Sequence, residues 1–319
     1  MNIDNLIGNT PIIKIKVKYK EKIVNVYAKL EYYNYTGSIK DRLANYIINT
    51  SKKEGILKEN MPIIEATSGN TGISFAALGS YHNHPVHIFM PNWVSKERIE
   101  IMKLYGAKVH LVTKEEGGFK TAIKKADELS KKLNGFRPDQ FNNIKNIEAH
   151  YNTTGLEIIN QVPKIDGFVS GIGTGGTLIG IAKRLKEKDE NIKITALEPK
   201  QLPLITKGIT SGSHKIEGIG DDFIPSIVDL SLIDEIITIN DEDAINTSRI
   251  LSQRYGLGIG ISSGANLLAS IITAKNNDNI VTIFADDNKK YLTTSLNKKI
   301  NPDKKLISNY IEIISIESI

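Results

Sequence analysis

The hydrophobic residues follow two periods along the chain, and stretches of the two kinds alternate. Short apolar or alternating runs predict β-strands; they cover residues 11–17, 24–30, 62–66, 86–90, 109–112, 167–170, 192–197, 236–239 and 280–284. Apolar residues spaced three and four apart predict helices. One helix begins just after Lys40, and the others cover residues 70–80, 95–105, 119–133, 146–160, 177–188, 241–255 and 265–274. Such alternation is typical of α/β proteins, whose mostly parallel sheets carry helices on both faces. The first two strands can form a hairpin.

The length of the chain indicates more than one hydrophobic core. Its 319 residues exceed what a single core ordinarily supports, so we expect two α/β lobes. We place a boundary between them near residue 145, although no linker rich in Pro, Gly or Ser marks it.

Composition and charge narrow the classes of function. The formal net charge is +5, but the lysines are scattered and no basic stripe is interleaved with aromatic residues, so we expect no nucleic-acid binding. The chain has no cysteine, which excludes disulfides, a catalytic thiolate and cysteine-ligated metals, and we expect no metal site. No apolar stretch approaches the ~18 residues of a membrane helix, and the polar N-terminus is unlike a signal peptide. We therefore expect a cytoplasmic protein without membrane contact.

The first of three glycine-bearing turns follows the predicted strand 62–66 and opens the next helix. It consists of Thr67, Ser68, Gly69, Asn70 and Thr71. Free backbone N–H groups and a positive helix dipole meet at such a helix start, which therefore binds anions. The small hydroxyl and amide side chains suit a carboxylate. Alternatively, they cap the helix with no ligand bound.

The second turn lies between the predicted strand 167–170 and the helix 177–188. Its glycines let the backbone approach an anion closely, and its threonine hydroxyls add donors, so a phosphate is the natural ligand. The residues expected to bind it are Gly173, Thr174, Gly175, Gly176 and Thr177. A structural turn without a ligand is another interpretation.

A competing interpretation of the second turn is a dinucleotide site. Gly171, Gly173 and Gly176 have the spacing of the dinucleotide fingerprint, and Glu198 ends the next strand, where an acid would hold a ribose. On that interpretation the protein is an NAD-dependent oxidoreductase.

The third turn and one lysine complete the set. The third turn, residues 260–265, opens a helix and offers two hydroxyls, those of Ser262 and Ser263. Lys40 stands at a turn that enters a helix, in the run Thr36-Gly37-Ser38-Ile39-Lys40. Most lysines are solvated surface charges. A lysine that forms a Schiff base must instead be desolvated beside cationic or dipolar groups, so that it loses its proton near neutral pH.

Taken together and in this order, the four segments resemble the cysteine synthase (O-acetylserine sulfhydrylase) and cystathionine β-synthase family of pyridoxal-phosphate enzymes. The resemblance runs over nearly the whole chain, from residues 7–11 (Ile-Gly-Asn-Thr-Pro) to Tyr291 and Leu292. It implies two open, twisted, mostly parallel α/β lobes with pyridoxal 5'-phosphate in the cleft between them, usually in a homodimer. Residues 36–145 would form a smaller mobile lobe, and residues 1–35 with 146–319 a larger one.

The resemblance also implies roles for individual residues. Lys40 would carry the cofactor as a Schiff base and then act as the base at the substrate α-carbon. Asn70 would bind the ring hydroxyl of the cofactor, Ser262 would face its pyridine nitrogen, and residues 173–177 would bind its phosphate. The substrate would be held by Thr67, Ser68, Gly69, Asn70, Thr71, Gln140 and Gly218.

The serine at the pyridine nitrogen indicates the type of reaction. A carboxylate there would keep the nitrogen protonated and make the ring a strong electron sink, whereas a neutral hydroxyl favours loss of a β-substituent over transamination. The resemblance thus implies β-replacement or β-elimination on O-acetylserine, serine or cysteine through an α-aminoacrylate. Sulfide, a thiol or water would be the nucleophile.

Two segments depart from the family pattern. Gly218-Ile219-Gly220 is followed by Asp221 where a small or aromatic residue is usual. Asp221 is either a solvated loop acid or an acid at the mouth of the site that orients or deprotonates a nucleophile. With cysteine as donor, water or a second cysteine would then form serine or lanthionine and release hydrogen sulfide. Residues 284–291 also differ, which leaves the nucleophile open.

Three classes of function therefore stand at this point: a pyridoxal-phosphate enzyme, a nicotinamide oxidoreductase, and a non-catalytic protein that binds partners in the same cleft. The second explains neither the setting of Lys40 nor the turn at Thr67. The third has no need of a Schiff-base lysine.

Overall fold

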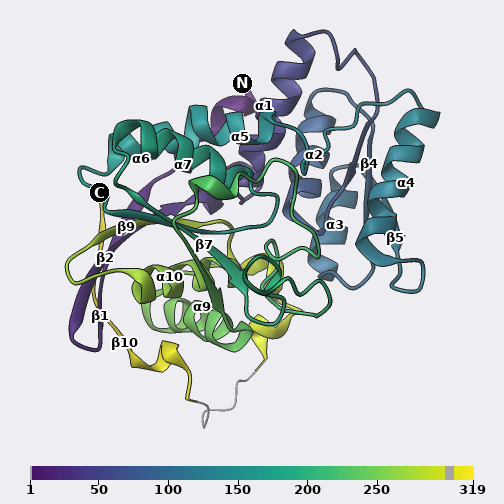
Figure 1. Cartoon of the computed structure of the whole chain (residues 1–319). Coiled ribbons are helices and arrows are strands. Elements are labelled where there is room, and N and C mark those ends of the chain that lie inside the picture. Colours follow the sequence, from purple (N-terminus) through teal and green to yellow (C-terminus); the bar gives the residue numbers. More distant parts are fainter. Residues whose placement is uncertain (1, 299–304) are drawn as a thin grey trace.

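The strands form two sheets, as Figure 1 shows. The computed structural model describes residues 2–298 and 305–319. One sheet has seven strands in the order β10-β1-β2-β9-β6-β7-β8, and the other has three in the order β3-β4-β5. All pairings except β1–β2 and β1–β10 are parallel, which confirms the predicted α/β class with mostly parallel sheets.

The small sheet and its helices come from one continuous stretch of chain, which we call the small lobe. Its strands are β3 (Ile63–Ala66), β4 (Val86–Pro91) and β5 (Lys108–Val112), and its helices are α1 (Lys40–Lys53), α2 (Asn70–Tyr81), α3 (Lys96–Leu104) and α4 (Gly118–Lys132). Nearly all of α2 is buried because it is built from small residues. At Gly72, in its first turn, even a Cβ atom would lie 2.8 Å from the side chain of Thr67, the residue after β3. This close packing fixes the start of α2 beside the end of β3.

The remaining elements form the large lobe around the seven-stranded sheet. Its strands are β1 (Ile12–Tyr19), β2 (Lys22–Leu30), β6 (Gly167–Gly171), β7 (Lys193–Pro199), β8 (Glu235–Ile239), β9 (Asn279–Phe284) and β10 (Ile311–Ser318). Its helices include α5 (Lys145–Ala149), α6 (Gly155–Gln161), α7 (Gly176–Lys188), α8 (Leu204–Lys207), α9 (Asp241–Tyr255) and α10 (Ile261–Thr273). In Figure 1, α6 and α7 cover one face of the sheet and α9 and α10 the other. The predicted hairpin is confirmed as β1–β2.

Two helices differ from the prediction. The helix expected over residues 146–160 contains a π-helical turn, His150–Thr154, between α5 and α6. α7 packs very close here, since a Cβ at Gly180 would lie 2.4 Å from the Ile147 carbonyl oxygen. The second helix, α10, begins at Ile261 rather than residue 265, because the third glycine turn is its own first helical turn.

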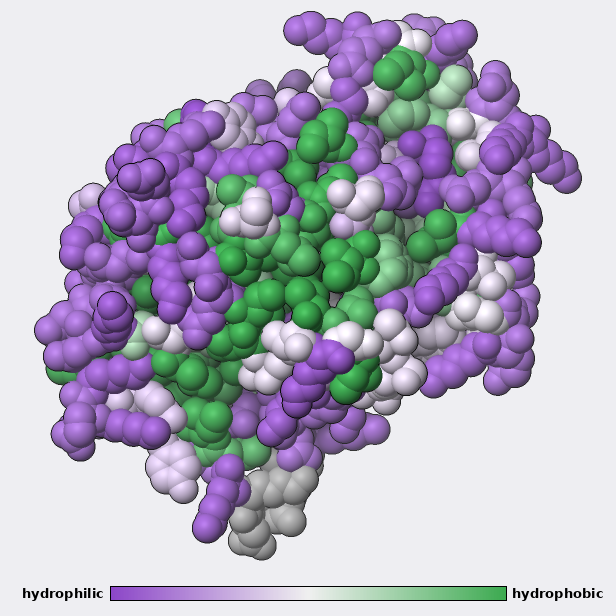
Figure 2. Space-filling view, in the orientation of Figure 1, coloured by the Kyte–Doolittle hydropathy of each residue, from purple (hydrophilic) through white to green (hydrophobic). Residues whose placement is uncertain are grey.

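The surface gives two further findings. Figure 2 shows apolar side chains gathered across the middle of the face seen in Figure 1, with polar side chains around them. Within residues 2–298 and 305–319, no helix is long and apolar enough to cross a membrane, and no group of three acidic or histidine side chains is arranged to hold a metal.

Candidate active site

The four segments singled out in the sequence meet in one cleft of about 540 Å³. Segments that follow the carboxyl ends of β6 and β9 and the starts of α1, α2 and α10 line it. Open α/β sheets place their ligand sites at this edge. Of the residues predicted from sequence, those in the wall of the cleft are Lys40, Asn70, Gly173, Thr174, Gly175, Thr177, Gly218 and Ser262.

Lys40 is the first residue of α1 and lines the cleft. Removal from water lowers the pKa of Lys40, while the carboxylates of Asp286 and Asp221 act in the opposite direction. A lowered pKa increases the fraction of free amine at neutral pH, which is the form that attacks a carbonyl carbon. The backbone before it is held to the large lobe, since Ile39 N donates to the Ala285 carbonyl across 2.9 Å.

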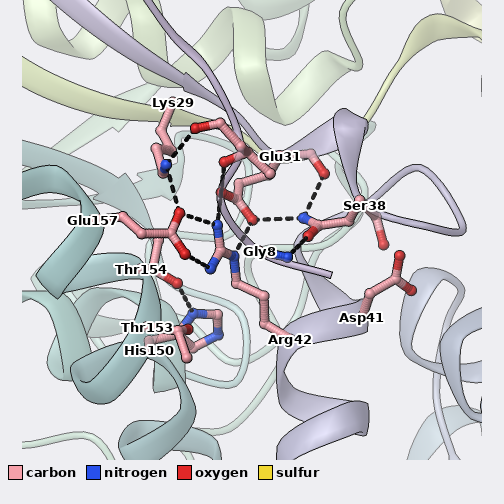
Figure 3. A network of polar contacts seen from close by, with 12 residues as sticks. Gly8, Lys29, Glu31, Ser38, Asp41, Arg42, His150, Thr153, Thr154 and Glu157 are labelled. Atoms are coloured by element: carbon pink, nitrogen blue, oxygen red, sulfur yellow. Dashed lines mark hydrogen bonds and ion pairs between the residues drawn. The ribbon is translucent and has the colours of Figure 1, made fainter. Parts of the chain in front are cut away.

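A buried ion network fixes the same end of α1 (Figure 3). Nε of Arg42 lies 2.6 Å from Glu31 Oε2, and Nη1 lies 2.7 Å from Glu157 Oε1. Lys29 Nζ adds a second cation, 2.7 Å from Glu157 Oε2. Bidentate, charge-assisted hydrogen bonds of this kind have strict geometry. Arg42 therefore connects the first turn of α1, which carries Lys40, to Glu31 just after β2 and to Glu157 of α6.

Residues 67–71, the Thr67 turn, lie at the start of α2. The Thr67 hydroxyl accepts a hydrogen bond from Gly69 N across 3.0 Å, which shapes the turn. Thr71 Oγ1 donates to Gln140 Oε1 across 2.8 Å, and Gln140 Nε2 donates to the Ala66 carbonyl across 2.9 Å. The structure thus brings Gln140 to the turn, while Ser68 is exposed at its tip.

In residues 171–177, the glycine turn, the glycines have no room for a side chain. Gly175 has a φ of +87°, and a Cβ there would lie 2.3 Å from the Val228 side chain. A Cβ at Gly173 would lie 2.3 Å from the Gly218 carbonyl oxygen. Gly176 packs behind the cleft wall against Asn146, whose Nδ2 donates to Thr174 Oγ1 across 2.9 Å.

The π-helical turn contacts the glycine turn directly. His150 is fully buried, and its Nε2 lies 3.2 Å from Thr177 Oγ1. Burial, then the charges of Lys40 and Arg42, lower the pKa of His150 well below its usual value. A neutral imidazole therefore orients the Thr177 hydroxyl, and the widened helical turn places the ring where it can do so.

The two serines of the third turn have different surroundings. Ser262 lies in the first turn of α10, is 6% exposed and lines the cleft. Ser263 instead accepts a hydrogen bond from Ala285 N across 3.0 Å and is structural.

Asp221 lies in the wall of a second, mostly apolar cavity of about 300 Å³, which shares Gly173 with the cleft. Removal from water, helped by the Asp222 carboxylate and opposed by Lys40, raises the pKa of Asp221 to about 6. Its neighbour Asp222 is ion-paired with exposed Lys120 at 2.9 Å.

Glu198 has a structural task. Its carboxylate accepts hydrogen bonds from the backbone N–H groups of Ile205 and Thr206, at 2.8 and 3.1 Å, and from the Thr206 hydroxyl. It therefore caps the short helix α8, and its oxygens are occupied. A ribose-binding role in a dinucleotide site is inconsistent with these bonds.

The sequence analysis gave no role to Asp286, within the divergent loop 284–291, and it missed two further charged residues, Arg98 and Glu217, of which Glu217 lines the cleft. Asp286 is 1% exposed; its Oδ2 accepts from Asn70 Nδ2 across 2.7 Å and from the Tyr291 hydroxyl across 2.8 Å. Arg98 is 2% exposed and lies 3.7 Å from the same oxygen. The position of Asp286 at the end of the last predicted strand was a usable signal. Arg98 gave none, since an arginine on a predicted helix is normally a surface residue.

The residues present fit pyridoxal phosphate. Asn70 Oδ1 is buried and has no hydrogen-bond partner among the described residues, so it can accept from a ring hydroxyl. The glycine turn at the start of α7 presents backbone N–H groups and hydroxyls to an anion. The lysine, the anion turn and the neutral serine all line one cleft.

Comparisons with known proteins identify the family of the chain. The model of the "Pyridoxal-phosphate dependent enzyme" family matches residues 3–286. A cysteine synthase B of Campylobacter jejuni is 44% identical over 298 residues, which are 92% of this chain and 97% of that protein. A cysteine synthase of Staphylococcus aureus is 40% identical over 300 residues, 92% and 96% of the two chains.

Solved structures are similar over the whole chain. A hydrogen sulfide-producing enzyme from Fusobacterium nucleatum has a TM-score of 0.94 at 43% identity, over 99% of this chain and 98% of that one. A further structure of that enzyme, with an aspartate replaced by asparagine, holds an α-aminoacrylate intermediate. An O-acetylserine-dependent cystathionine β-synthase from Helicobacter pylori has a TM-score of 0.86 at 35% identity, over 93% and 99%. The chain therefore belongs to the family of pyridoxal-phosphate-dependent enzymes and, within it, to the cysteine synthase and cystathionine β-synthase group.

Proposed function

We propose that the cleft binds a small β-substituted L-amino acid and that Lys40 holds the cofactor covalently and then moves the proton at the substrate α-carbon. Cysteine synthase-like β-replacement is the chemistry of the group. The observation that carries the assignment to Lys40 is its place in the cleft wall, with a lowered pKa, in the same cleft as the glycine turn.

The other residues bind and orient. We assign the substrate carboxylate to the Thr67 turn with Gln140 and Gly218, and the cofactor phosphate to residues 173–177. When bound, the cofactor supplies an electron sink for the α-carbon. We assign Ser262 to its ring nitrogen, where a neutral hydroxyl leaves that sink weak and favours departure of the β-substituent.

The visible absorption band of the purified protein tests the proposal. The purified protein is expected to be yellow, and borohydride should remove the visible band by reducing the bond to Lys40. Lys40→Ala should lack that covalent bond, whereas Lys289→Ala, at a lysine whose side chain is 83% exposed, should behave as wild type. A colourless wild-type protein that binds NAD would disprove the proposal.

A second candidate is a cysteine lyase that releases hydrogen sulfide and forms serine or lanthionine. Asp221 favours it, because a half-buried carboxyl with a pKa of about 6 lies next to the cleft and can accept a proton from water or a thiol. The similarity to the Fusobacterium nucleatum enzyme supports the same candidate. In this role Asp221 would be catalytic.

The two candidate functions differ in whether the enzyme consumes sulfide or releases it. Sulfide consumption with O-acetylserine is measured against sulfide release from cysteine, in wild type, in Asp221→Asn and in Asp222→Asn as the matched control. Loss of sulfide release in Asp221→Asn alone supports the second candidate. Equal rates in all three proteins remove Asp221 from the mechanism.

We also propose that residues 36–145 move as one lobe and that the protein is a homodimer. The continuous course of the small lobe, from α1 to α4, supports the first. The resemblance to the family supports the second. Light scattering at several concentrations tests the oligomeric state, and a mass equal to the 35.3 kDa chain would contradict it.

A further inference from the structure

Arg98 of the small lobe is a buried cation that contacts two loops of the large lobe beside the cleft. Its guanidinium forms an ion pair with Glu217, and Nη2 lies 3.7 Å from Asp286 Oδ2. The Tyr291 ring lies under the guanidinium, with 4.7 Å between Cζ and the ring centroid. Glu217, Asp286 and Tyr291 all belong to the large lobe, so Arg98 connects the two lobes.

The same side chain lies against the Thr67 turn. A Cβ placed on Gly69 would be 2.7 Å from both Cδ and Nε of Arg98. Nε is buried and has no hydrogen-bond partner in the described part of the chain. A guanidinium in this position adds positive charge beside the N-terminus of α2, where the helix dipole already favours an anion.

Asp286 connects Arg98 to Asn70, the residue proposed to bind the cofactor. It lies beside Arg98 and accepts a hydrogen bond from Asn70 Nδ2. Asn70 is both the first residue of α2 and part of the cleft wall. A movement of Arg98 toward an anion in the Thr67 turn would therefore shift Asp286 and Asn70 together.

Burying the Arg98 guanidinium costs hydration free energy, so its position needs an explanation. A buried charge that has lost water needs paired charges and hydrogen bonds, and apolar side chains of similar size often give equal or better stability. Arg98 has two carboxylates from a different lobe and an unused donor, Nε, that packs against Gly69 of the Thr67 turn. These contacts suit a group that senses an anion better than one that only fills the core.

We infer that Arg98 is a positioning residue that couples binding of the substrate carboxylate in the Thr67 turn to the orientation of Asn70 and to the contact between the lobes at Glu217. This inference rests on the proposed function, since it takes the Thr67 turn as the carboxylate site. Arg98 acts through the turn and through Asp286, so its loss should weaken substrate binding more than turnover.

The experiment uses the holoenzyme and the single tryptophan, Trp93, which lies in the loop just before α3. L-Alanine, which has the carboxylate but no β-leaving group, is titrated while tryptophan emission is recorded. Wild type should respond, and in Arg98→Met the midpoint should rise at least about tenfold. Arg98→Lys keeps the charge but loses the planar, bidentate guanidinium, so its midpoint should lie between those of wild type and Arg98→Met.

Kinetics and a matched control complete the test. With the reacting substrate, KM should rise in Arg98→Met by a similar factor while kcat falls by less than about threefold, the pattern of lost ground-state binding. Arg184→Met is the control, because Arg184 also lies over a tyrosine ring at 4.7 Å, that of Tyr151, but does not line the cleft. It should match wild type in both measurements.

The outcomes separate the two proposals. If wild type responds to L-alanine and Arg98→Met responds with the same midpoint and KM, the role of Arg98 is disproved while the proposed function stands. If wild type itself fails to respond, the carboxylate site is wrong and the inference fails with it. If Arg98→Met does not fold, Glu217→Gln at the partly exposed end of the ion pair replaces it; a midpoint raised about threefold supports the coupling, and an unchanged one disproves it.

Discussion

Asn70 and Asp286, which are 216 positions apart in the chain, are joined by a hydrogen bond of 2.7 Å from Nδ2 to Oδ2. The bond ties the start of α2 in the small lobe to the loop after β9 in the large lobe. The same oxygen accepts the Tyr291 hydroxyl, and burial together with this carboxylate raises the pKa of that hydroxyl above its usual range. Asp286 is therefore the acceptor around which this side of the cleft is built.

Replacing Asp286 should destabilise the protein even without cofactor. Asp286→Leu leaves Arg98 with one carboxylate fewer and leaves two donors unpaired, at an expected cost of about 3 kcal/mol. Asp286→Asn retains an acceptor oxygen and should cost less. Urea unfolding of the cofactor-free protein measures both, with Asp287→Asn at the neighbouring acid as control. A free energy of unfolding in Asp286→Leu equal to that of wild type would show that the contacts of Asp286 do not stabilise the loop after β9.

Asp221 should give sulfide release from cysteine a distinct pH dependence. Only the ionised carboxylate accepts a proton, so activity should rise as pH increases through about 6. The rise is measured from sulfide release between pH 5 and 8, a range set by that pKa, about one to two units to either side. Asp221→Asn should lose most of the activity and the rise near pH 6, while Asp222→Asn keeps both.

The same pKa also predicts a stability difference. The folded pKa of Asp221 lies above its ordinary value of 3.8, so ionisation inside the protein opposes folding, and this penalty is complete above pH 6. Asp221→Asn removes the charge and should therefore unfold at the same temperature as wild type, or higher, at pH 7. A large loss of stability would mean that Asp221 is a structural acid, and the activity loss could not then be assigned to proton transfer.

The elements with a strong periodic pattern could be predicted from sequence because their side chains pack locally. The three strands of the small lobe and α2 follow directly from apolar runs and small residues. The three glycine turns were recognisable because each stands between a strand and a helix or opens a helix. Lys40 became a candidate only through their order.

The remaining features depend on contacts between distant residues. Strand β10 forms only by pairing with β1, in a register in which Ile13 and Ser318, 305 positions apart, are partners, and no local pattern specifies this pairing. Glu198 stands where a ribose-binding acid would, yet it caps α8, a helix too short to have a periodic signal. Arg98 and Asp286 are buried because they meet across the two lobes, and neither residue type predicts burial by itself.

The Glu157 carboxylate should make the protein sensitive to acid. Burial alone would raise its pKa, but hydrogen bonds and charges from Arg42 and Lys29 lower it to about 2. A lowered folded pKa contributes stability above the ordinary value of 4.5, and this contribution is lost as pH falls toward 2. Glu157→Gln should thus cost about 3 kcal/mol at pH 7 and clearly less at pH 3.

Urea unfolding at the two pH values measures this difference. Glu187→Gln is the control, because that glutamate is 55% exposed and its ion pair with Arg184 should contribute little at either pH. A loss of stability in Glu157→Gln that is the same at pH 7 and pH 3 would show that Glu157 acts through packing rather than charge.

Gly175 should be required for cofactor binding for reasons of shape as well as backbone strain. Gly175→Ala forces a φ of +87° on a residue with a Cβ and places that atom 2.3 Å from Val228.

Gly256→Ala is the matched control: it has a φ of +68° at the end of α9 but nothing within 4 Å of the added atom. Left-handed strain alone costs about 1 kcal/mol, so Gly256→Ala should unfold at a slightly lower temperature and keep its yellow colour. Gly175→Ala should in addition bind pyridoxal phosphate at least about tenfold more weakly in a titration of the visible band, because relief of the contact with Val228 should displace the backbone N–H groups that we propose bind the phosphate. Equal affinity in the two variants would mean that the phosphate is held elsewhere than in the glycine turn.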